Sequence, residues 1–262
     1  ILPLLDKEIS QSLSMNMKRK GAQIFTNSKL ERVENVDGKG HLFIEGKEEP
    51  LIADRMLKAV GRTANLEGLF DENTEKPQIE RGRIVTQNYY QTSLPNLYAV
   101  GDIIHGPQLA HAASAQGLFV ADYLAGKEEG TKATSIPSCI YTRPEVATVG
   151  LTEEEAKEQG IKTVSSKYIM TGNGRTVIAG SGRGFIKIVA QEGDETVIGA
   201  HLMCENASDI VSEFTLAIAN KLTVSQMLKP VRPHPTFSEG VTEALESLHG
   251  RAIHIAPPRK KQ

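Results

Sequence analysis

The chain has 262 residues, of which 39% are hydrophobic and 24% charged, a composition typical of folded globular proteins with one large or two smaller domains. The formal net charge of −2 gives no reason to expect nucleic acid or an anionic membrane as a partner, and no apolar run reaches the roughly 20 residues of a membrane span. Cys139 and Cys204 are too far apart in sequence for a C-x-x-C pair or a zinc cluster. We interpret both as core thiols in a reducing, cytoplasmic setting, and predict no metal site.

A helix and a three-stranded β-meander are predicted in the first 60 residues. Asp6 is a candidate N-cap, and apolar side chains then recur every four residues until a basic last turn and Gly21. Alternation of apolar and polar residues predicts strands over 22–34 and 41–45, with a third at 52–60. The glycine-rich turn after the first of these strands favours a hairpin connection.

Two glycine-marked strand ends are candidate ligand contacts. Gly61 follows the third predicted strand, where a glycine either lets the backbone approach a ligand or turns the chain. Residues 97–102 predict a buried strand that places Asp102 at the carboxyl edge of an α/β sheet, where ligands bind. Asp102 could accept hydrogen bonds from a polyol or make an Asx-turn. A small-residue helix is predicted over 106–117, and its first backbone N–H groups can hold an anion or an electron-rich ring edge.

The second half predicts an α+β domain after a charged, aperiodic boundary at 126–134. Thr152 to Glu155 forms a capping box before a short acidic helix. Strands are predicted at 162–170, 184–190 and 196–203, and helices at 208–220, 223–228 and 237–249. The glycines between 172 and 184 fit no phosphate-loop pattern, so we interpret them as hairpin turns.

The segment Arg232-Pro233-His234-Pro235-Thr236-Phe237-Ser238-Glu239 is the candidate catalytic unit. Two prolines stiffen the loop around His234. Histidine can take and return a proton near neutral pH, and a carboxylate on its other ring nitrogen fixes the tautomer and stabilises the cation. Glu239 is the candidate partner. Alternatively, Thr236-x-x-Glu239 is a capping box and His234 is only a loop residue.

Five segments in order resemble the flavin-dependent pyridine-nucleotide disulfide oxidoreductases, and their dihydrolipoyl dehydrogenase branch most closely. The resemblance covers nearly all of the chain. Each segment alone is a weak or moderate match, but five in the right order and spacing are specific. They are residues 59–62, 92–102, 106–111, 136–147 and 234–239.

The resemblance implies FAD and NAD as cofactors. Asp102 would bind the ribityl chain of FAD, and the helix start would face the isoalloxazine ring. The positions that match this helix start are Gln108, Leu109, Ala110 and His111. Leu30 and Gly61 match positions that line the NAD site.

The resemblance also implies an acid/base role for His234. It would deprotonate a substrate dithiol so that the thiolate attacks an active-site disulfide, with Glu239 orienting the ring. In the family this histidine serves the partner subunit's disulfide, so a homodimer is expected. A cis bond between His234 and Pro235 is expected as well. The implied substrate is a lipoyl group on the lipoyl domain of a 2-oxo acid dehydrogenase complex.

The domain assignment follows from the same resemblance. Residues 1–63 match the second part of the NAD-binding domain, 64–133 the returning segment of the FAD-binding domain, and 134–262 the dimerisation domain. The expected fold is therefore an α+β dimerisation domain preceded by partial α/β NAD- and FAD-binding domains. Because the chain begins at Ile1 in an apolar stretch that we interpret as a buried strand, we expect a piece of a longer protein.

The departures from the family are the glycine fingerprints and the C-x-x-x-x-C disulfide, which this sequence does not contain. We therefore expect the 262-residue chain to be inactive alone, and residues 1–133 to hold a native shape poorly because their half-sheets leave open edges. Two alternatives remain. The dithiol could be that of a glutathione reductase, which also has a His-Pro-Thr segment, or the chain could be an inactive dimerisation module.

Overall fold

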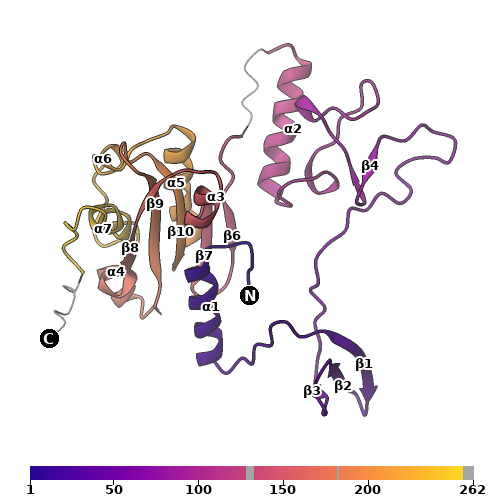
Figure 1. Ribbon diagram of the computed structural model, residues 1–262, viewed down its shortest axis with the longest axis horizontal. Coiled ribbons are helices and arrows are strands. Elements are labelled where there is room, and N and C mark those ends of the chain that lie inside the picture. The colour runs from indigo at the N-terminus through magenta and orange to yellow at the C-terminus, as the bar shows by residue number, and fades with distance from the viewer. Residues whose placement is uncertain (128–132, 182, 256–262) are drawn as a thin grey trace.

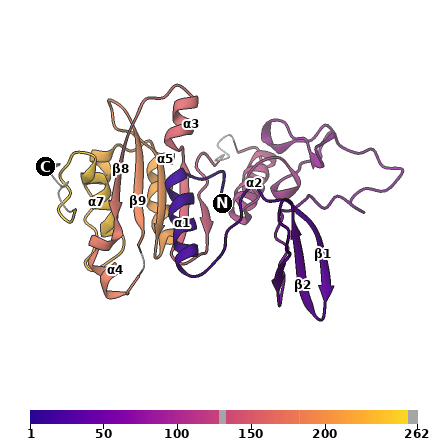
Figure 2. The same ribbon diagram turned by 60° about the horizontal axis from the view of Figure 1, so that its bottom comes forward.

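The computed structural model describes residues 1–127, 133–181 and 183–255. Its largest unit is a five-stranded antiparallel sheet with the order β6-β7-β10-β9-β8. The strands are β6 (Ser138–Ile140), β7 (Glu145–Gly150), β8 (Thr163–Ile169), β9 (Phe185–Gln191) and β10 (Val197–Cys204). Figures 1 and 2 show helices on both sides of this sheet, and the expected α+β domain is confirmed.

Alternate residues along the strands face the two sides of the sheet. On one side α5 (Ala207–Ala219) and α7 (Glu239–Ser247) cover a core that contains Ala147, Ile186 and Leu202. On the other side the next residues along, Val146, Phe185 and Met203, pack against Ile9 and Leu13 of α1 (Lys7–Arg19). The first helix of the chain is therefore part of the packing of the C-terminal sheet.

An ionic cluster adds to the attachment of α1. The Lys187 ammonium on β9 lies 2.9 Å from Asp6, 3.1 Å from Glu8 and 2.6 Å from Glu153. Asp6 is also the predicted N-cap, because its carboxylate accepts from the backbone N–H groups of Glu8 and Ile9. A lysine in a sheet centre is tolerated only when such partners surround it.

The β-meander is confirmed, but its first and third strands are shorter than predicted, and its second begins two residues earlier. β1 (Leu30–Val36), β2 (Lys39–Ile44) and β3 (Leu51–Ala53) pair in sequence order. Residues 22–29 and 54–60 are not strands. Within the described residues, the strand pairing of the meander begins at Leu30 and ends at Ala53. These strands, β1 to β3, form a small sheet separate from the large one (Figure 1).

Residues 64–127 form a third unit with short elements. β4 (Ile79–Glu80) pairs with β5 (Arg83–Ile84), followed by two 3₁₀ turns, η1 (Asn88–Tyr90) and η2 (Gly101–Ile103), and by α2 (Ala110–Leu124). The predicted strand at 97–102 is wrong. Tyr98 makes a single β-bridge to Gln91, and the 3₁₀ turn η2 follows. Within the described residues no neighbouring strand extends this bridge into a ladder of backbone hydrogen bonds.

Most remaining elements follow the sequence prediction with small shifts, but residues 1–5, interpreted as a buried strand, form a turn whose residues are exposed or half-buried. α2 begins at Ala110 rather than at residue 106 and continues to Leu124. The capping box from Thr152 to Glu155 opens α3 (Glu153–Glu158), and Thr223 caps α6 (Val224–Met227). Between β8 and β9 the chain forms η3 (Met170–Gly172) and α4 (Gly174–Ile178) instead of simple hairpin turns.

Three further sequence predictions concern the cysteines, the domain boundary and a membrane span. Cys204 is buried and Cys139 half-buried, and neither forms a disulfide. The predicted boundary at 126–134 falls largely on residues 128–132, which, like Gly182, lie outside the described residues. Among the helices of the described residues, none is long and apolar enough to cross a membrane.

Candidate functional site

A proline-rich loop carries His234 to the start of α7. The peptide bond between His234 and Pro235 is cis, as predicted. Arg232 anchors the loop: its guanidinium contacts Glu213, donates to Thr242 Oγ1 at 2.8 Å and donates to the Met227 carbonyl at 3.2 Å. The arginine side chain is only 6% exposed, so these bonds hold the loop to α5, α6 and α7 together.

Glu239, the first residue of α7, makes both interactions that the sequence left open. Its Oε1 lies 2.9 Å from His234 Nδ1, and its Oε2 accepts the backbone N–H of Thr236 at 2.9 Å. The reciprocal half of a capping box is absent among the described contacts, since Thr236 Oγ1 donates to the Pro233 carbonyl. One carboxylate therefore fixes both the imidazole and the turn that precedes the helix.

The electrostatics of this pair favour an ionised Glu239. Partial burial opposes its charge, but the Thr236 N–H and the His234 imidazole outweigh burial and hold the pKa of Glu239 below its usual range. The carboxylate then accepts from Nδ1–H, which leaves Nε2 as the basic nitrogen. Because the His234 side chain is 77% exposed, Nε2 is open to a reactant.

Two cavities flank the loop. One of about 590 Å³ lies toward α5 and contains Asp209, Glu213 and Phe237. The other, of about 500 Å³, contains His234 and Glu239 together with three residues that sequence reasoning missed: Tyr168, Glu243 and His254. The spacing of Glu243, one helical turn after Glu239, is the signal that could have identified it.

A second group of predicted residues meets at η2 and the start of α2. The Asp102 carboxylate is 40% exposed and lies 3.4 Å from the guanidinium of Arg62. Gln108 lies against the guanidinium of Arg83. Its amide oxygen can accept a hydrogen bond from that guanidinium at 2.6 Å. The Arg83 guanidinium also donates to the Asp102 backbone carbonyl. The arginine therefore links the Asp102 turn to the segment before α2.

The helix start itself is open. Leu109 is the N-cap and its side chain gives no capping bond, so the first N–H groups after it have no side-chain acceptor within the described part of the chain. Ala110 is exposed, and His111 Nε2 bonds to the Pro137 carbonyl at 2.8 Å. Gly101 has a φ of 75° and a Cβ there would lie 3.1 Å from Ala113, so the turn packs closely on α2.

The two predicted nicotinamide-site positions are exposed and stand apart from both groups. Leu30 begins β1 and is 47% exposed, and Gly61 has a φ of 104° in an irregular segment. Figure 1 shows α7, α2 and the β1–β3 sheet in separate parts of the molecule. The chain therefore presents three groups of predicted residues rather than one assembled site.

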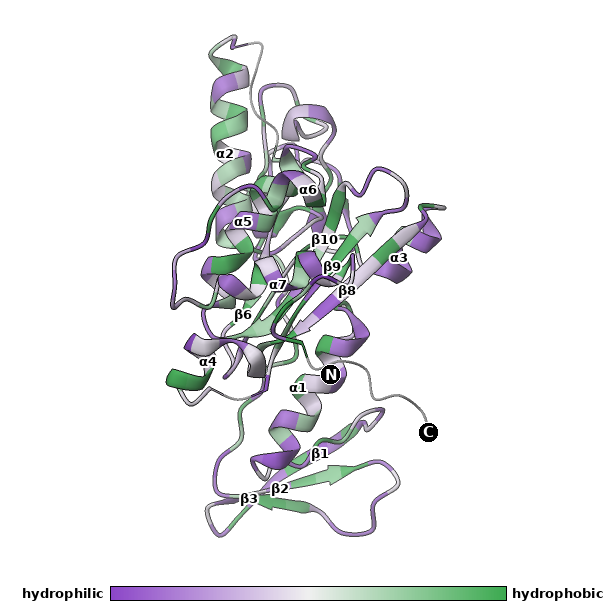
Figure 3. Cartoon of the chain, turned by 90° about the vertical axis from the view of Figure 1, so that its left-hand side faces the viewer, coloured by the Kyte–Doolittle hydropathy of each residue, from purple (hydrophilic) through white to green (hydrophobic). Residues whose placement is uncertain are grey.

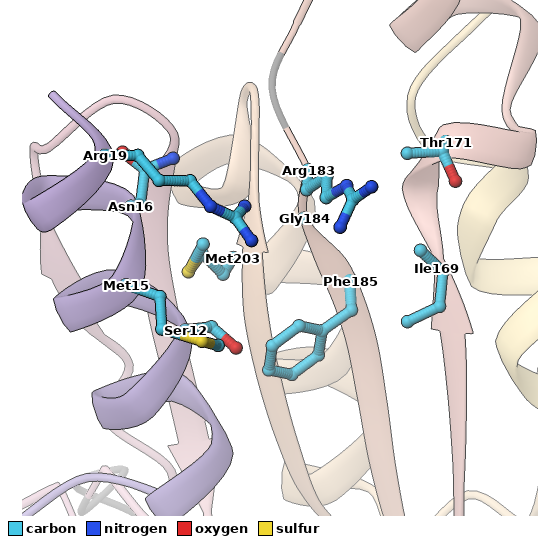
Figure 4. A pocket seen from close by; sticks show the side chains of 10 residues that line it. All are labelled: Ser12, Met15, Asn16, Arg19, Ile169, Thr171, Arg183, Gly184, Phe185 and Met203. Atoms are coloured by element: carbon cyan, nitrogen blue, oxygen red, sulfur yellow. The ribbon is translucent and has the colours of Figure 1, made fainter.

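A further cavity contains none of the predicted residues. It measures about 480 Å³ and lies between α1 and the edge of the large sheet, with Arg19 and Arg183 at its rim and Phe185 and Met203 at its base (Figure 4). His201 on β10 does not line this cavity; it is buried in the sheet and bonds to Thr148 and to the Leu151 carbonyl. Burial lowers the pKa of His201 despite the attraction of Asp6.

Comparison with known families decides the family. A model described as "Pyridine nucleotide-disulphide oxidoreductase, dimerisation domain" matches residues 136–245, and one described as "Pyridine nucleotide-disulphide oxidoreductase" matches residues 1–117. The chain belongs to the pyridine nucleotide-disulphide oxidoreductases. FAD and NAD are the cofactors of this family.

Similar proteins agree with the family. A dihydrolipoyl dehydrogenase of Bacillus subtilis is 37% identical over 97% of this chain and 55% of its own length. That of Thermus scotoductus is also 37% identical, over 97% and 56%. The chain thus spans about half the length of the curated relatives it matches.

Solved structures show the same fold. The HOCl-induced flavoprotein disulfide reductase RclA of Escherichia coli superposes with a TM-score of 0.85 at 24% identity, over 94% of this chain and 56% of that one. LpdA of Mycobacterium tuberculosis gives 0.83 at 23% identity, over 93% and 53%. At these identities the likeness concerns the arrangement of helices and strands alone.

Proposed function

We propose that the chain is the C-terminal portion of a dihydrolipoyl dehydrogenase, an enzyme that oxidises a dithiol with NAD through FAD and an active-site disulfide. The observation that carries the proposal is the His234–Glu239 pair, 2.9 Å apart on a loop anchored by Arg232. The 37% identity to two dihydrolipoyl dehydrogenases supports this branch over the other disulfide reductases.

The proposed chemistry of His234 follows from its hydrogen bond. With Nδ1–H directed at Glu239, Nε2 accepts the proton of a substrate thiol, and the resulting imidazolium is stabilised by the carboxylate. The thiolate then attacks one sulfur of a disulfide and releases the other as a thiolate. Neither Cys139 nor Cys204 suits that disulfide, because burial raises the pKa of both thiols, to about 12 for Cys204.

The residues around η2 fit the flavin that the family uses. Asp102 offers a half-exposed carboxylate that can accept from polyol hydroxyls, and the uncapped start of α2 offers N–H groups to an electron-rich ring edge. In this proposal Asp102, Gln108, Leu109, Ala110 and His111 hold FAD. When bound, FAD supplies an acceptor for the dithiol's electrons on their way to NAD. Leu30 and Gly61 are proposed to line the NAD site.

A homodimer is part of the proposal. The dimerisation domain leaves several large apolar side chains exposed, which is typical of a surface that meets another protein. They are Tyr141, Val177, Ile178, Leu216 and Val231, between 62% and 96% exposed. A second copy that covers them would bring the disulfide of one subunit to His234 of the other. The proposed substrate is a lipoyl group on the lipoyl domain of a 2-oxo acid dehydrogenase complex.

The test supplies the part of the enzyme that this chain does not span. The 262-residue chain is joined to the preceding part of the Bacillus subtilis relative, and oxidation of dihydrolipoamide by NAD is measured. Activity is expected, and His234→Gln should reduce it by roughly 10²- to 10⁴-fold, the usual contribution of a general base. Reduction of the bound flavin by NADH, which needs no dithiol base, should change little in the same variant.

The outcomes separate the alternatives. Reduction of glutathione disulfide without oxidation of dihydrolipoamide would move the chain to the glutathione reductase branch. A dimeric, flavin-coloured chimera that neither oxidises dihydrolipoamide nor reduces glutathione disulfide would favour a dimerisation module without turnover. The unjoined chain is expected to be inactive, and its oxidation of dihydrolipoamide would contradict that expectation.

A further inference from the structure

Helix α7 holds two histidines in the same way. Glu239 Oε1 binds Nδ1 of His234 at 2.9 Å while Oε2 accepts a backbone N–H. One turn later, Glu243 Oε1 binds Nδ1 of His254 at 2.8 Å while Oε2 accepts the backbone N–H groups of Ile253 and His254, each at 3.0 Å. Residues four apart share a helix face, so both imidazoles are held on one side of α7.

The segment that carries His254 is fitted closely against η3. A Cβ at Gly172 would lie 2.5 Å from the His254 carbonyl oxygen and 2.8 Å from the Tyr168 hydroxyl. Such approaches leave no room for a side chain, so the glycine is what allows the chain to pass there. His254 is thus placed by Glu243 on one side and by the surface around Gly172 on the other.

Both imidazoles line the cavity of about 500 Å³. The charged groups that face it within the described residues are Glu239 and Glu243 from α7 and Arg232 from the preceding loop, whose guanidinium is paired with Glu213. From β8, Tyr168 faces it as a neutral phenol, because burial, Glu243 and Glu239 raise its pKa to about 12. The cavity therefore holds two carboxylates and two imidazoles whose charges respond to each other.

We propose that His254, held by Glu243, is a positioning residue for His234: the two His–Glu pairs share one cavity, and the charge on one pair acts on the other. This inference rests on the proposed role of His234 as the base. A proton on His254 makes a second positive charge on His234 less favourable, while Glu243 has the opposite effect. His254 thereby keeps Nε2 of His234 free to accept a thiol proton at lower pH.

The test is an NMR titration of the 262-residue chain with ¹³C-labelled histidine, in which the His234 signal is assigned by its loss in His234→Gln. In His254→Gln, a cation is removed and the Glu243 carboxylate is left without its partner. Both changes favour protonated His234, so the midpoint of its titration should rise by on the order of half a unit, a size typical of charges partly screened by water.

A matched control is His249→Gln. His249 also binds a glutamate, with Nε2 2.8 Å from Glu195, but it does not line the cavity. This variant should leave the His234 midpoint in place. Gly172→Ala, which must displace the His254 segment, should move the midpoint in the same direction as His254→Gln.

Two results would overturn the proposal: an unchanged His234 midpoint in His254→Gln, or an equal shift in His249→Gln. Neither result depends on turnover, so it is distinguishable from failure of the proposed enzymatic function, which is measured with dihydrolipoamide. In the active chimera, the acid limb of the pH profile of kcat/KM should shift upward with the same variant.

Discussion

The large sheet and the β1–β3 meander show how differently two antiparallel sheets of one chain can be stabilised. All residues of β9 from Phe185 to Ala190 are buried, whereas every residue of β1 is exposed. Both sheets carry hydrophobic residues, as the green strands of Figure 3 show. The difference lies in what covers them: helices lie on both faces of the large sheet, and no described helix packs on the meander.

Strand pairing and burial are therefore separate sources of stability. The meander keeps its ladder from Leu30 to Ala53 without a buried residue, but a small sheet needs an apolar face covered to be stable by itself. Leu30 and Val33 lie on one face of the meander and Val36 and Ile52 on the other, and all four are exposed, so neither face is covered. The large sheet instead shares a core with α5 and α7.

The largest expected effect comes from removing the same side chain in the two regions. Phe214 on α5 is fully buried in the core, so Phe214→Ala should lower the free energy of unfolding by about 3 to 5 kcal/mol. Phe43 on β2 is half-buried, with the Arg32 guanidinium 3.6 Å from its ring centroid. Phe43→Ala should cost about 1 kcal/mol or less. Urea denaturation followed by circular dichroism measures both.

Equal losses for the two phenylalanines would contradict separate stabilisation of the two sheets, because they would mean that the meander unfolds together with the large sheet. If unfolding of Phe214→Ala instead shows two transitions, with the meander signal unmoved, the two sheets are stabilised separately. Hydrogen exchange of the β1 and β9 amides distinguishes the two outcomes by residue.

Sequence reasoning succeeded where local signals were sufficient. Asp6 and Thr152 were predicted as caps from their residue types and spacing, and their side chains do cap helices. It failed at 97–102, where an apolar run predicted a strand but pairing depends on neighbours that local sequence does not specify. The attachment of α1 to the large sheet was also beyond a local pattern, because it joins residues 181 positions apart.

The candidate site was predictable only where local sequence determines it. His234 and Glu239 are close in sequence and the prolines restrict the loop, so their pairing could be proposed in advance. His254 was missed because the return of the chain over Gly172 is a tertiary contact. The roles of Asp102, Leu30 and Gly61 remain predictions carried by the family resemblance.

The second expected effect tests what joins α1 to the large sheet. The Lys187 side chain is 6% exposed and Asp6 is 1% exposed. Lys187→Met would leave Asp6 buried without its cation, so the free energy of unfolding should fall by about 3 kcal/mol. Lys167→Met is the matched control, since Lys167 contacts Glu8 at 38% exposure and should cost less than about 1 kcal/mol. An equal loss in both variants would show that the buried Lys187–Asp6 pair contributes no more to the free energy of unfolding than the exposed Lys167–Glu8 pair.

The smallest expected effect is the acid dependence of that attachment. Burial opposes ionisation of Asp6 and Glu8, but Lys187, with Lys167 beside Glu8, holds the pKa of each carboxylate below its ordinary value of 3.8 or 4.5. Lowered values mean that the stabilisation is fully present above those ordinary values. It should be lost as pH falls below them and through the folded-state values, because the unfolded chain binds protons first.

Denaturation midpoints measured between pH 6 and pH 2.5 should therefore decline more steeply in the native chain than in Lys187→Met. In that variant burial of Asp6 is no longer offset by its main cation, so the carboxylate gains less from folding in its charged form. Parallel declines would assign the acid sensitivity to other carboxylates. A flatter decline in the variant would place the acid sensitivity at the contact between α1 and the large sheet. The meander has no such contact with a described helix.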